Sequence, residues 1–382
     1  MIKKSIFEEI VNPQLKKIVP YIPGPMTKDI AAKYEMDPAR VIKLSSNENP
    51  LGVPPLAKAK IIEMAGEASL YPDAEARELR GALAQYVNMR PENIVVGPGS
   101  SSLMMHIIEV FSSPQDEVVF TSPAFGSFYE EITLARGRRP VKVALEENFD
   151  LDVAKLKKAL SQRSRVIFIT RPNNPTSKLV PLEDLREIMQ AAQAVKAIVV
   201  SDEAYVEFAD PHSSALEFFY EMGEGINLLV TRTFSKAFGL ADVRLGYCVG
   251  PVVAISLLTK AKPKWGTGML AQSAGVAALK DKEHLQRTLE VVRKGREYLQ
   301  RELGRLGLKM VDAPQGNYVT AKVSDFGFTA EAFTEELCRR GGIMIRGDFH
   351  PEYVRISIGT MPQNEAVVQT VAQMLEGRKK RG

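Results

Sequence analysis

The sequence is poor in the residues that build disulfide frameworks and zinc sites. It holds only two cysteines, Cys248 and Cys338, and four scattered histidines. Two cysteines cannot form the several cross-links of a disulfide-rich secreted domain, and no cluster of histidine and cysteine has zinc-ligand spacing. We therefore expect a chain that works in a reducing compartment without a bound metal.

Long apolar runs and a strong charge of one sign are also lacking. No stretch of 18 apolar residues occurs, and Glu8 and Glu9 interrupt the N-terminal segment before the apolar core of a signal peptide develops. The formal net charge of +4 equals the charge of the four basic residues at 378–381, so the rest of the chain is neutral. These features predict a cytoplasmic protein that binds neither membrane nor nucleic acid.

Short apolar runs alternate with amphipathic stretches through the middle of the chain. Runs rich in Val, Ile or Phe predict strands buried on both faces, and stretches such as 152–160 and 182–195 predict helices between them. This alternation predicts an α/β fold, with a three-layer α/β/α large domain built on a mostly parallel seven-stranded sheet. The expected strands are 94–96, 117–120, 139–143, 166–170, 197–201, 227–231 and 247–249.

The pattern changes after about residue 270. A long amphipathic helix is expected over 282–306, followed by short strands near 318–323, 343–346 and 354–357 and a closing helix over 364–376. These elements predict a smaller α+β domain. The first 45 residues are rich in proline and predict an arm. We expect an arm at 1–45 that joins the small domain, a large cofactor-binding domain at 46–270, and a small domain at 271–382.

Polar residues of complementary type follow three of the predicted strands. In open α/β sheets, ligands bind at the carboxyl ends of the strands. A buried carboxylate needs a cationic partner, a lysine can form an imine with an aldehyde, and an arginine among hydroxyls suits a phosphate. Pyridine nitrogen, aldehyde, ring hydroxyl and phosphate are the four groups of pyridoxal 5′-phosphate. The residues are Asn173 and Asn174, then Asp202 and Tyr205, then Thr233, Ser235, Lys236 and Arg244.

A glycine-containing turn adds to this set. The strand expected at 94–96 leads into Gly97, Pro98 and Gly99, then Ser100 and Ser101, and then an apolar helix. Glycines before a helix expose backbone N–H groups to a phosphate. The turn lacks the lysine of a P-loop and is a weak signal alone, but together with Lys236 and Arg244 it predicts a phosphate-binding cup.

The ordered set of motifs resembles the fold type I pyridoxal-phosphate-dependent aminotransferases, which have the aspartate aminotransferase fold. Within them it is most similar to histidinol-phosphate aminotransferases over nearly the whole chain. The resemblance implies transfer of the amino group of L-histidinol phosphate to 2-oxoglutarate in histidine biosynthesis, by a homodimer with a shared active site. It is carried by KLSSNENPLG at 43–52, YPD at 71–73, PNNPTS at 172–177, SDEAY at 201–205, SKAFGLADVRLG at 235–246 and VRISIGT at 354–360.

The resemblance also implies roles for single residues. The implied catalytic residues are Lys236, which binds the cofactor aldehyde as an imine and moves the substrate proton, Asp202, which faces the pyridine nitrogen, and Tyr205. Tyr205 and Asn174 correspond to ligands of the ring hydroxyl oxygen. The other implied cofactor contacts are Ser100, Ser101, Thr233, Ser235 and Arg244 at the phosphate, Phe125 on the ring, and Tyr71 at the phosphate of the neighbouring subunit.

The substrate side is implied by fewer residues. Arg355 corresponds to an arginine that grips a substrate carboxylate in a bidentate manner, and Asn174 is also expected to contact the substrate. Arg346 corresponds to an arginine that helps bind the phosphate of the substrate. Tyr21, in the proline-rich arm, is a candidate lid residue.

Several positions differ from the family pattern. Phe125 stands where the family often has tyrosine, and Asp242 replaces a glycine. The turn at 97–102 lacks an amide and two acidic side chains, and Trp265 begins an altered stretch. Two alternatives therefore stay open. One is another reaction with the same cofactor: an aromatic or other amino-acid aminotransferase, a phospho-amino-acid decarboxylase or an amino-acid oxidase. The other is a non-catalytic protein that keeps the cofactor as a ligand.

Overall fold

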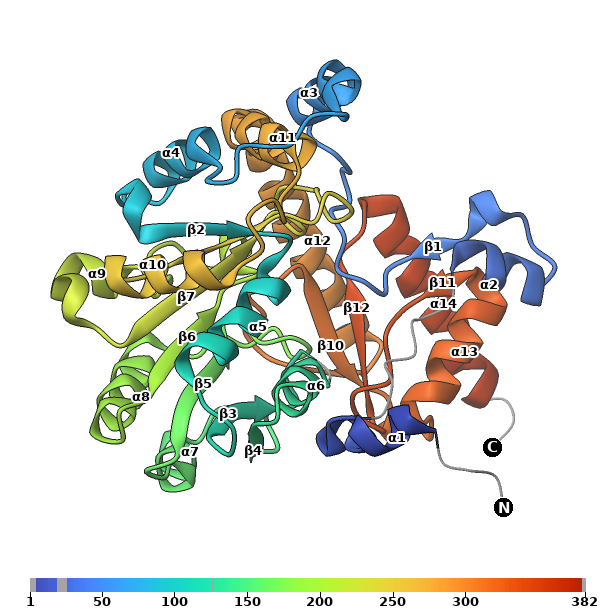
Figure 1. Cartoon of the computed structure of the whole chain (residues 1–382). Coiled ribbons are helices and arrows are strands. Elements are labelled where there is room, and N and C mark those ends of the chain that lie inside the picture. The colour runs from blue at the N-terminus through green and yellow to red at the C-terminus, as the bar shows by residue number, and fades with distance from the viewer. Residues whose placement is uncertain (1–4, 19–25, 126, 380–382) are drawn as a thin grey trace.

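A seven-stranded sheet organises the larger part of the molecule (Figure 1). The computed structural model describes residues 5–18, 26–125 and 127–379. The strand order is β2-β8-β7-β6-β5-β3-β4, and only β8 runs antiparallel to its neighbours. The predicted mostly parallel sheet is therefore confirmed. The strands are β2 (Ile94–Gly97), β3 (Glu117–Ser122), β4 (Arg139–Ala144), β5 (Ser164–Thr170), β6 (Ile198–Asp202), β7 (Leu228–Thr233) and β8 (Gly246–Val249).

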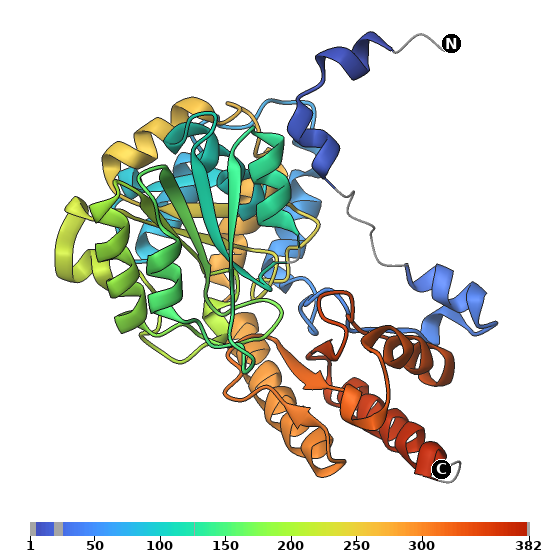
Figure 2. The ribbon, with the colours of Figure 1, turned by 90° about the horizontal axis from the view of Figure 1, so that it is seen from below.

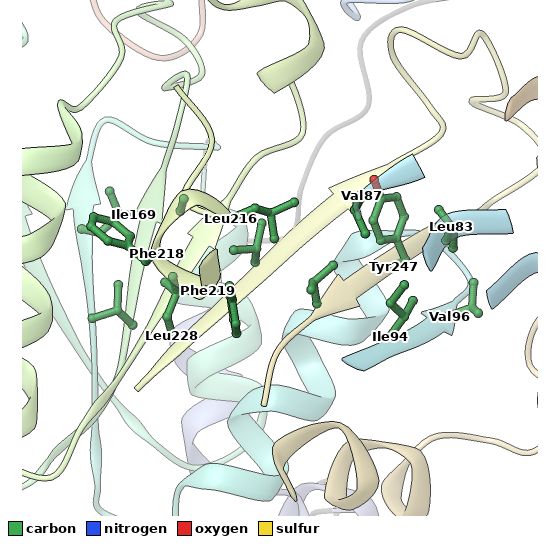
Figure 3. Packing of buried hydrophobic residues seen from close by; sticks show 14 of the residues in the cluster. Leu83, Val87, Ile94, Val96, Ile169, Leu216, Phe218, Phe219, Leu228 and Tyr247 are labelled. Carbon is green, nitrogen blue, oxygen red and sulfur yellow. The ribbon is translucent and has the colours of Figure 1, made fainter. Parts of the chain in front are cut away.

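Helices cover both faces of this sheet, as strands with continuous apolar runs require. On one face, Val95, Val118 and Val166 pack against α5 (Ser100–Phe111), α6 (Phe128–Ala135) and α10 (Val252–Ala261). On the other face, alternate residues of the same strands pack against a second set of helices (Figure 3). That set comprises α4 (Arg77–Tyr86), α7 (Val153–Ala159), α8 (Leu182–Ala194), α9 (Glu217–Met222) and α11 (Met269–Lys280).

A second hydrophobic core lies in the C-terminal part of the chain, beside the sheet (Figure 2). A three-stranded antiparallel sheet of order β12-β10-β9 packs against three helices. These elements are α12 (Lys282–Arg305), β9 (Lys309–Met310), β10 (Tyr318–Lys322), α13 (Ala330–Gly341), β12 (Tyr353–Ser357) and α14 (Met361–Lys379). The short strand β11 (Ile343–Met344) belongs to a separate two-stranded sheet. The two cores are the physical basis for a division into a large and a small unit.

The N-terminal segment joins the smaller unit through α2 (Thr27–Lys33) and β1 (Ile42–Lys43). Strand β1 pairs in parallel with β11, and Ile30 of α2 packs against Cys338 and Met344. Before them lie α1 (Ile6–Ile10) and a 3-10 turn at Pro13–Lys17. We propose that residues 1–45 act as the arm expected from the proline pattern.

Helix α11 belongs with the larger unit, although it follows residue 270. Ala274, Val276 and Ala277 are part of the first core, and α11 packs against α4 and α3 (Pro55–Met64). A Cβ on Gly275 would lie 2.5 Å from the Leu245 side chain, so these elements approach closely. We propose that the large unit extends to about residue 280, ten residues beyond the boundary expected from periodicity.

The closing helix begins at Met361 rather than at residue 364. The Thr360 N–H donates to Gln363 Oε1 at 2.8 Å, and Asn364 N–H donates to Thr360 O at 3.0 Å. The first bond is one half of a capping box, the second is the first backbone bond of the helix, and Pro362 fits the first helical turn. Within the described residues, no helix is long and apolar enough to cross a membrane.

Candidate active site

A cavity of about 280 Å³ opens at the carboxyl ends of β5, β6 and β7, beside the start of α5. Thr170, Asp202 and Thr231 are opposite one another in register, so three neighbouring strands end at the same edge. The cavity is lined by Ser46, Glu48, Ser100, Ser101, Phe125, Thr170, Asn174, Asp202, Ala204, Tyr205, Thr233, Ser235, Lys236, Ala241 and Arg244. Every predicted cofactor-binding residue except Tyr71 lines this cavity.

Lys236 presents a buried amine to this cavity. Its Nζ donates to Ser46 O at 2.9 Å and lies 5.7 Å from the centre of the Tyr205 ring. Burial, helped by the positive charge of Arg355, lowers the pKa of Lys236 to about 7. The amine therefore has a substantial neutral fraction near neutral pH, which a nucleophile or a general base requires.

Asp202 presents a buried carboxylate to the same cavity. It is 3% exposed at the end of β6, and burial raises the pKa of Asp202 to about 6. Its Oδ2 accepts from Tyr129 Oη at 2.7 Å and its Oδ1 accepts from Thr231 Oγ1 at 3.5 Å. No lysine or arginine in the described part of the chain forms an ion pair with it. A cationic ligand group would supply the missing counter-charge.

The start of α5 forms an anion-binding cup with the loop after β7. Ser100 and Ser101 begin the helix, where free N–H groups and the helix dipole favour an anion. Arg244 Nη1 donates to Ser235 Oγ at 3.3 Å, and Thr233 Oγ1 donates to Ser235 Oγ at 3.0 Å. These side chains place one guanidinium and several hydroxyls around the same end of the cavity.

Two glycines allow this cup to close. Gly99 has φ +82°, and a Cβ there would lie 2.6 Å from Arg244 Nη2. A Cβ on Gly246 would lie 2.3 Å from the backbone nitrogen of Ser100. The first position requires glycine for its left-handed backbone and the second for the close approach of β8 to α5.

Asn174 and Tyr205 line another part of the cavity, and Arg355 lies against Asn174 without lining the cavity itself. Arg355 Nη1 donates to Asn174 Oδ1 at 2.5 Å, and Arg355 Nη2 also donates to Ser45 O. Tyr205 Oη accepts from Asn47 Nδ2 at 3.2 Å. The buried Nε of Arg355 has no hydrogen-bond partner among the described residues. This unsatisfied donor fits an arginine that awaits an anionic ligand.

Phe125 covers another side of the cavity. Its N–H donates to Asn174 O at 2.6 Å, and its ring packs 4.8 Å from that of Phe128. The ring is 36% exposed, so one face is available to a planar ligand.

Three predicted residues lie elsewhere or are not described. Arg346 forms an ion pair with Asp348 at 2.7 Å and a two-way backbone pair with Arg355, so it is placed beside the Arg355 strand rather than on the cavity wall. Tyr71 is 80% exposed and packs 5.2 Å from the Trp265 ring. Tyr21 lies outside the described residues.

Several residues that support the site were not predicted from sequence. Asn47 donates to Tyr205 and also exchanges hydrogen bonds with Ser357, which ties the two units together. Its signal was the NEN stretch inside a motif already quoted at 43–52. Tyr129 had no signal, since a tyrosine four residues after Phe125 looks like an ordinary helical core residue.

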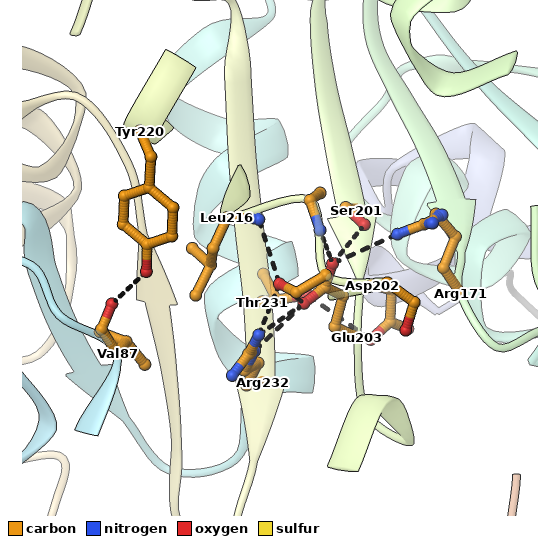
Figure 4. A network of polar contacts seen from close by, with 12 residues as sticks. Val87, Arg171, Ser201, Asp202, Glu203, Leu216, Tyr220, Thr231 and Arg232 are labelled. Atoms are coloured by element: carbon orange, nitrogen blue, oxygen red, sulfur yellow. Dashed lines mark hydrogen bonds and ion pairs between the residues drawn. The ribbon is translucent and has the colours of Figure 1, made fainter. Parts of the chain in front are cut away.

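A buried ion network lies directly behind Asp202 (Figure 4). Glu203 accepts from Arg232 Nη2 at 2.9 Å and pairs with Arg171 at 3.4 Å. Ser201 Oγ, Ser214 Oγ and the Ala215 N–H complete its hydrogen bonds. Satisfied on every side, Glu203 points away from the cavity and fixes the backbone that carries Asp202.

Comparison with known proteins identifies the family. Residues 39–371 match the model of aminotransferase class I and II. The chain belongs to the class I and II aminotransferases. This confirms the family expected from the sequence motifs and, with it, the enzymatic class.

Individual relatives cover almost the whole aminotransferase chain. It is 38% identical to a histidinol-phosphate aminotransferase of Methanosarcina barkeri over 367 residues, which is 94% of this chain and 96% of that protein. It is 35% identical to a histidinol-phosphate aminotransferase of Akkermansia muciniphila, over 96% of this chain and 99% of the other.

Solved structures confirm the fold. A histidinol-phosphate aminotransferase from Sinorhizobium meliloti in complex with pyridoxal 5′-phosphate has a TM-score of 0.84 at 22% identity, over 96% of this chain and 98% of that one. An aromatic aminotransferase from Pyrococcus horikoshii has a TM-score of 0.78 at 25% identity, over 93% and 100% of the two chains.

The donor set of the cavity fits pyridoxal 5′-phosphate, the cofactor implied by the sequence motifs. Asp202 has no cationic partner among the residues that the structure describes and would pair with a protonated ring nitrogen, and the cup at Ser100 and Arg244 suits a phosphate. Lys236 supplies the amine for the aldehyde. Each group of the cofactor thus has a matching residue in one cavity.

Proposed function

We propose that this enzyme transfers the amino group of L-histidinol phosphate to 2-oxoglutarate, with pyridoxal 5′-phosphate as cofactor. The observation that carries the activity is a lysine whose buried amine has a lowered pKa, in the same cavity as a buried carboxylate that no lysine or arginine of the described residues neutralises. The choice of substrate is supported by 32–38% identity to histidinol-phosphate aminotransferases over nearly full length.

The bound cofactor supplies an aldehyde that takes up the amino group and a ring that withdraws electrons from the substrate carbon. Lys236 Nζ, neutral in part near pH 7, would accept the proton from that substrate carbon. The negative charge of Asp202 would favour a protonated ring nitrogen in the bound cofactor. Lys236 would thus move the substrate proton, and Asp202 would maintain the positive charge on the ring nitrogen.

The remaining wall residues orient the reactants. Ser100, Ser101 and Arg244 would hold the cofactor phosphate, and Phe125 would cover the ring. Tyr205 and Asn174 would face the ring hydroxyl oxygen. Arg355 would bind the carboxylate of glutamate or 2-oxoglutarate with its guanidinium, which already lies against Asn174.

A panel of amino donors tests this function directly. The purified enzyme is expected to release glutamate from 2-oxoglutarate with L-histidinol phosphate as donor, at a kcat/KM well above that with phenylalanine, tyrosine or aspartate. Preference for an aromatic amino acid would replace the proposed substrate with the aromatic alternative. Failure of every donor to convert the cofactor to its amine form would contradict the aminotransferase reaction itself.

Replacement of Arg355 by alanine is expected to change the KM values of the two substrates by different amounts. Hydrogen bonds to a charged group contribute about 1.5–3 kcal/mol, so KM for glutamate should rise about 10- to 100-fold. Histidinol phosphate has no carboxylate, and its KM should change much less. Steady-state kinetics in both directions measures the ratio, with Arg355→Lys as the charge-retaining control; equal increases of the two KM values would contradict the role.

We also propose that the enzyme is a homodimer in which Tyr71 acts on the partner's site. Exposed apolar side chains occur on α3 and on the segments just before and after it, namely Val53, Leu56, Ile62, Leu70 and Tyr71, and Trp265 packs against Tyr71. Such a surface favours association with a second chain. Sedimentation equilibrium is expected to give twice the chain mass, and a monomer at micromolar concentration would contradict the shared site.

A further inference from the structure

Tyr129 lies beneath the cavity and contacts its carboxylate, yet no role follows for it from the family motifs. Its Oη donates to Asp202 Oδ2 at 2.7 Å and lies 2.8 Å from Thr170 Oγ1. The side chain is completely buried, and its ring stacks on Phe168 with 4.8 Å between centres and 15° between planes. The position of its hydroxyl is therefore fixed by packing on all sides.

The direction of this hydrogen-bond chain follows from counting protons. A tyrosine hydroxyl has one proton, and a charged carboxylate only accepts. If Tyr129 donates to Asp202, then Thr170 must donate to Tyr129, so the chain runs from Thr170 through Tyr129 to Asp202. Hydrogen bonds aligned in one direction strengthen one another, and the charged carboxylate is the acceptor that benefits.

Among the groups around Asp202, the Tyr129 hydroxyl is the main hydrogen-bond donor to the carboxylate. Thr231 donates at the long distance of 3.5 Å, and the Ala204 N–H also donates to Asp202 but lowers its pKa less than Tyr129 does. Tyr205 and Tyr318 are ionisable groups near Asp202, Lys236 and Arg244 line the same cavity, and the charge of Glu203, behind Asp202, opposes ionisation of Asp202. Burial raises the pKa of Tyr129 itself well above 10, so this hydroxyl keeps its proton throughout the working range of pH.

We propose that Tyr129 is a positioning residue that fixes the rotation of the Asp202 carboxylate and favours its charged form toward the ring nitrogen of the cofactor. The inference rests on the proposed role of Asp202. Phe125 would cover the ring from the same segment that carries Tyr129, four residues further along. Phe125 and Tyr129 would thus serve the face of the ring and the carboxylate at its nitrogen, respectively.

Tyr129→Phe tests the proposal, since it removes one oxygen and keeps the stacked ring. The titration of Asp202 is followed by carboxyl ¹³C NMR in the full-length chain freed of cofactor, with the signal assigned from Asp202→Asn. The midpoint, about 6 in the unaltered chain, is expected to rise to about 7 or higher, because the charged form loses its best donor. An unchanged midpoint would overturn the proposal.

The loss of this hydrogen-bond donor should also make the stability of the variant depend on pH. With its donor removed, Asp202 has a folded-state pKa still further above its unfolded value, so the charged carboxylate costs more in the folded chain at high pH. Tyr129→Phe is therefore expected to be more destabilised relative to the unaltered chain at pH 8 than at pH 5. A stability loss that is equal at both pH values would indicate a packing role only and would overturn the proposal.

Two further variants keep the test sharp. Thr170→Val, which removes the first donor of the chain, is expected to move the Asp202 midpoint in the same direction by a smaller amount, and it decides the matter if Tyr129→Phe does not fold. Tyr220→Phe removes a hydroxyl that donates to Val87 O at 2.7 Å, remote from the cavity (Figure 4), and should leave the midpoint unchanged.

Cofactor affinity separates this proposal from the role of Asp202 on which it rests. Equilibrium dialysis of the Tyr129→Phe enzyme at pH 5 is expected to show cofactor binding about tenfold weaker than in the unaltered enzyme, because a midpoint about one pH unit higher leaves about a tenth as much charged Asp202. A raised Asp202 midpoint with undiminished affinity would support the contact between Tyr129 and Asp202 and would overturn the role of Asp202 at the ring nitrogen.

Discussion

Lys236→Ala is expected to lower kcat at least about 10³-fold and to abolish the covalent attachment of the cofactor. The residue supplies both the amine for the aldehyde and the base for the substrate proton, and general-base catalysis alone contributes about 10²–10⁴-fold. No second lysine lines the cavity among the described residues, so no neighbouring amine can substitute. Initial rates and the visible absorbance of the purified protein measure the two effects.

A matched control is available in Lys262. Its amine is also partly buried, burial lowers its pKa, and its Nζ donates to a backbone carbonyl, Ala74 O, at 3.4 Å. Lys262→Ala should keep the absorbance and the rate within about twofold. Retention of normal colour by Lys236→Ala would count decisively against the assigned role.

Asp202→Asn is expected to lower kcat by about 10²–10³-fold, the usual loss when one charge or donor aimed at a reacting centre is removed. The variant keeps the size of the side chain and removes only the charge that holds a proton on the ring nitrogen. Single-turnover measurement with histidinol phosphate should place the loss in the proton-transfer step. A normal rate would show that this carboxylate has no part in the reaction.

The same substitution has the opposite effect on the cofactor-free fold. The folded-state pKa of Asp202, about 6, lies above its ordinary value of 3.8, so its charged form costs stability above pH 6. An amide carries no such cost. At pH 8 the cofactor-free Asp202→Asn chain is expected to unfold at the same temperature as the unaltered chain or higher. Scanning calorimetry on the two proteins checks the sign.

The sequence predicted the strands that are buried on both faces and the functional residues at their carboxyl ends. Strands such as Ser164–Thr170 and Ile198–Asp202 are short runs of apolar residues, and a run of this kind between helices has few other stable arrangements. Because parallel strands end at the same edge, Asn174, Asp202 and Lys236 had to lie near one another. Their convergence on one cavity agrees with that reasoning.

The features that escaped prediction depend on contacts between distant segments. Helix α11 is made largely of small residues, and its place in the first core is decided by its close fit to Leu79 and Leu245. Asn47 and Tyr129 reach their partners across 158 and 73 residues of sequence, respectively. Periodicity reports which face of an element is buried, but it does not report which hydroxyl or amide meets a given carboxylate.

Reduction of the holoenzyme with borohydride, followed by mass analysis of its peptides, tests the central claim most directly. Borohydride converts a covalent link between an amine and the cofactor aldehyde into a stable secondary amine. The account predicts one modified peptide, the one that contains Lys236, with the mass of the reduced cofactor added. An unmodified Lys236 peptide, or an adduct on another lysine such as Lys178 or Lys262, would contradict it.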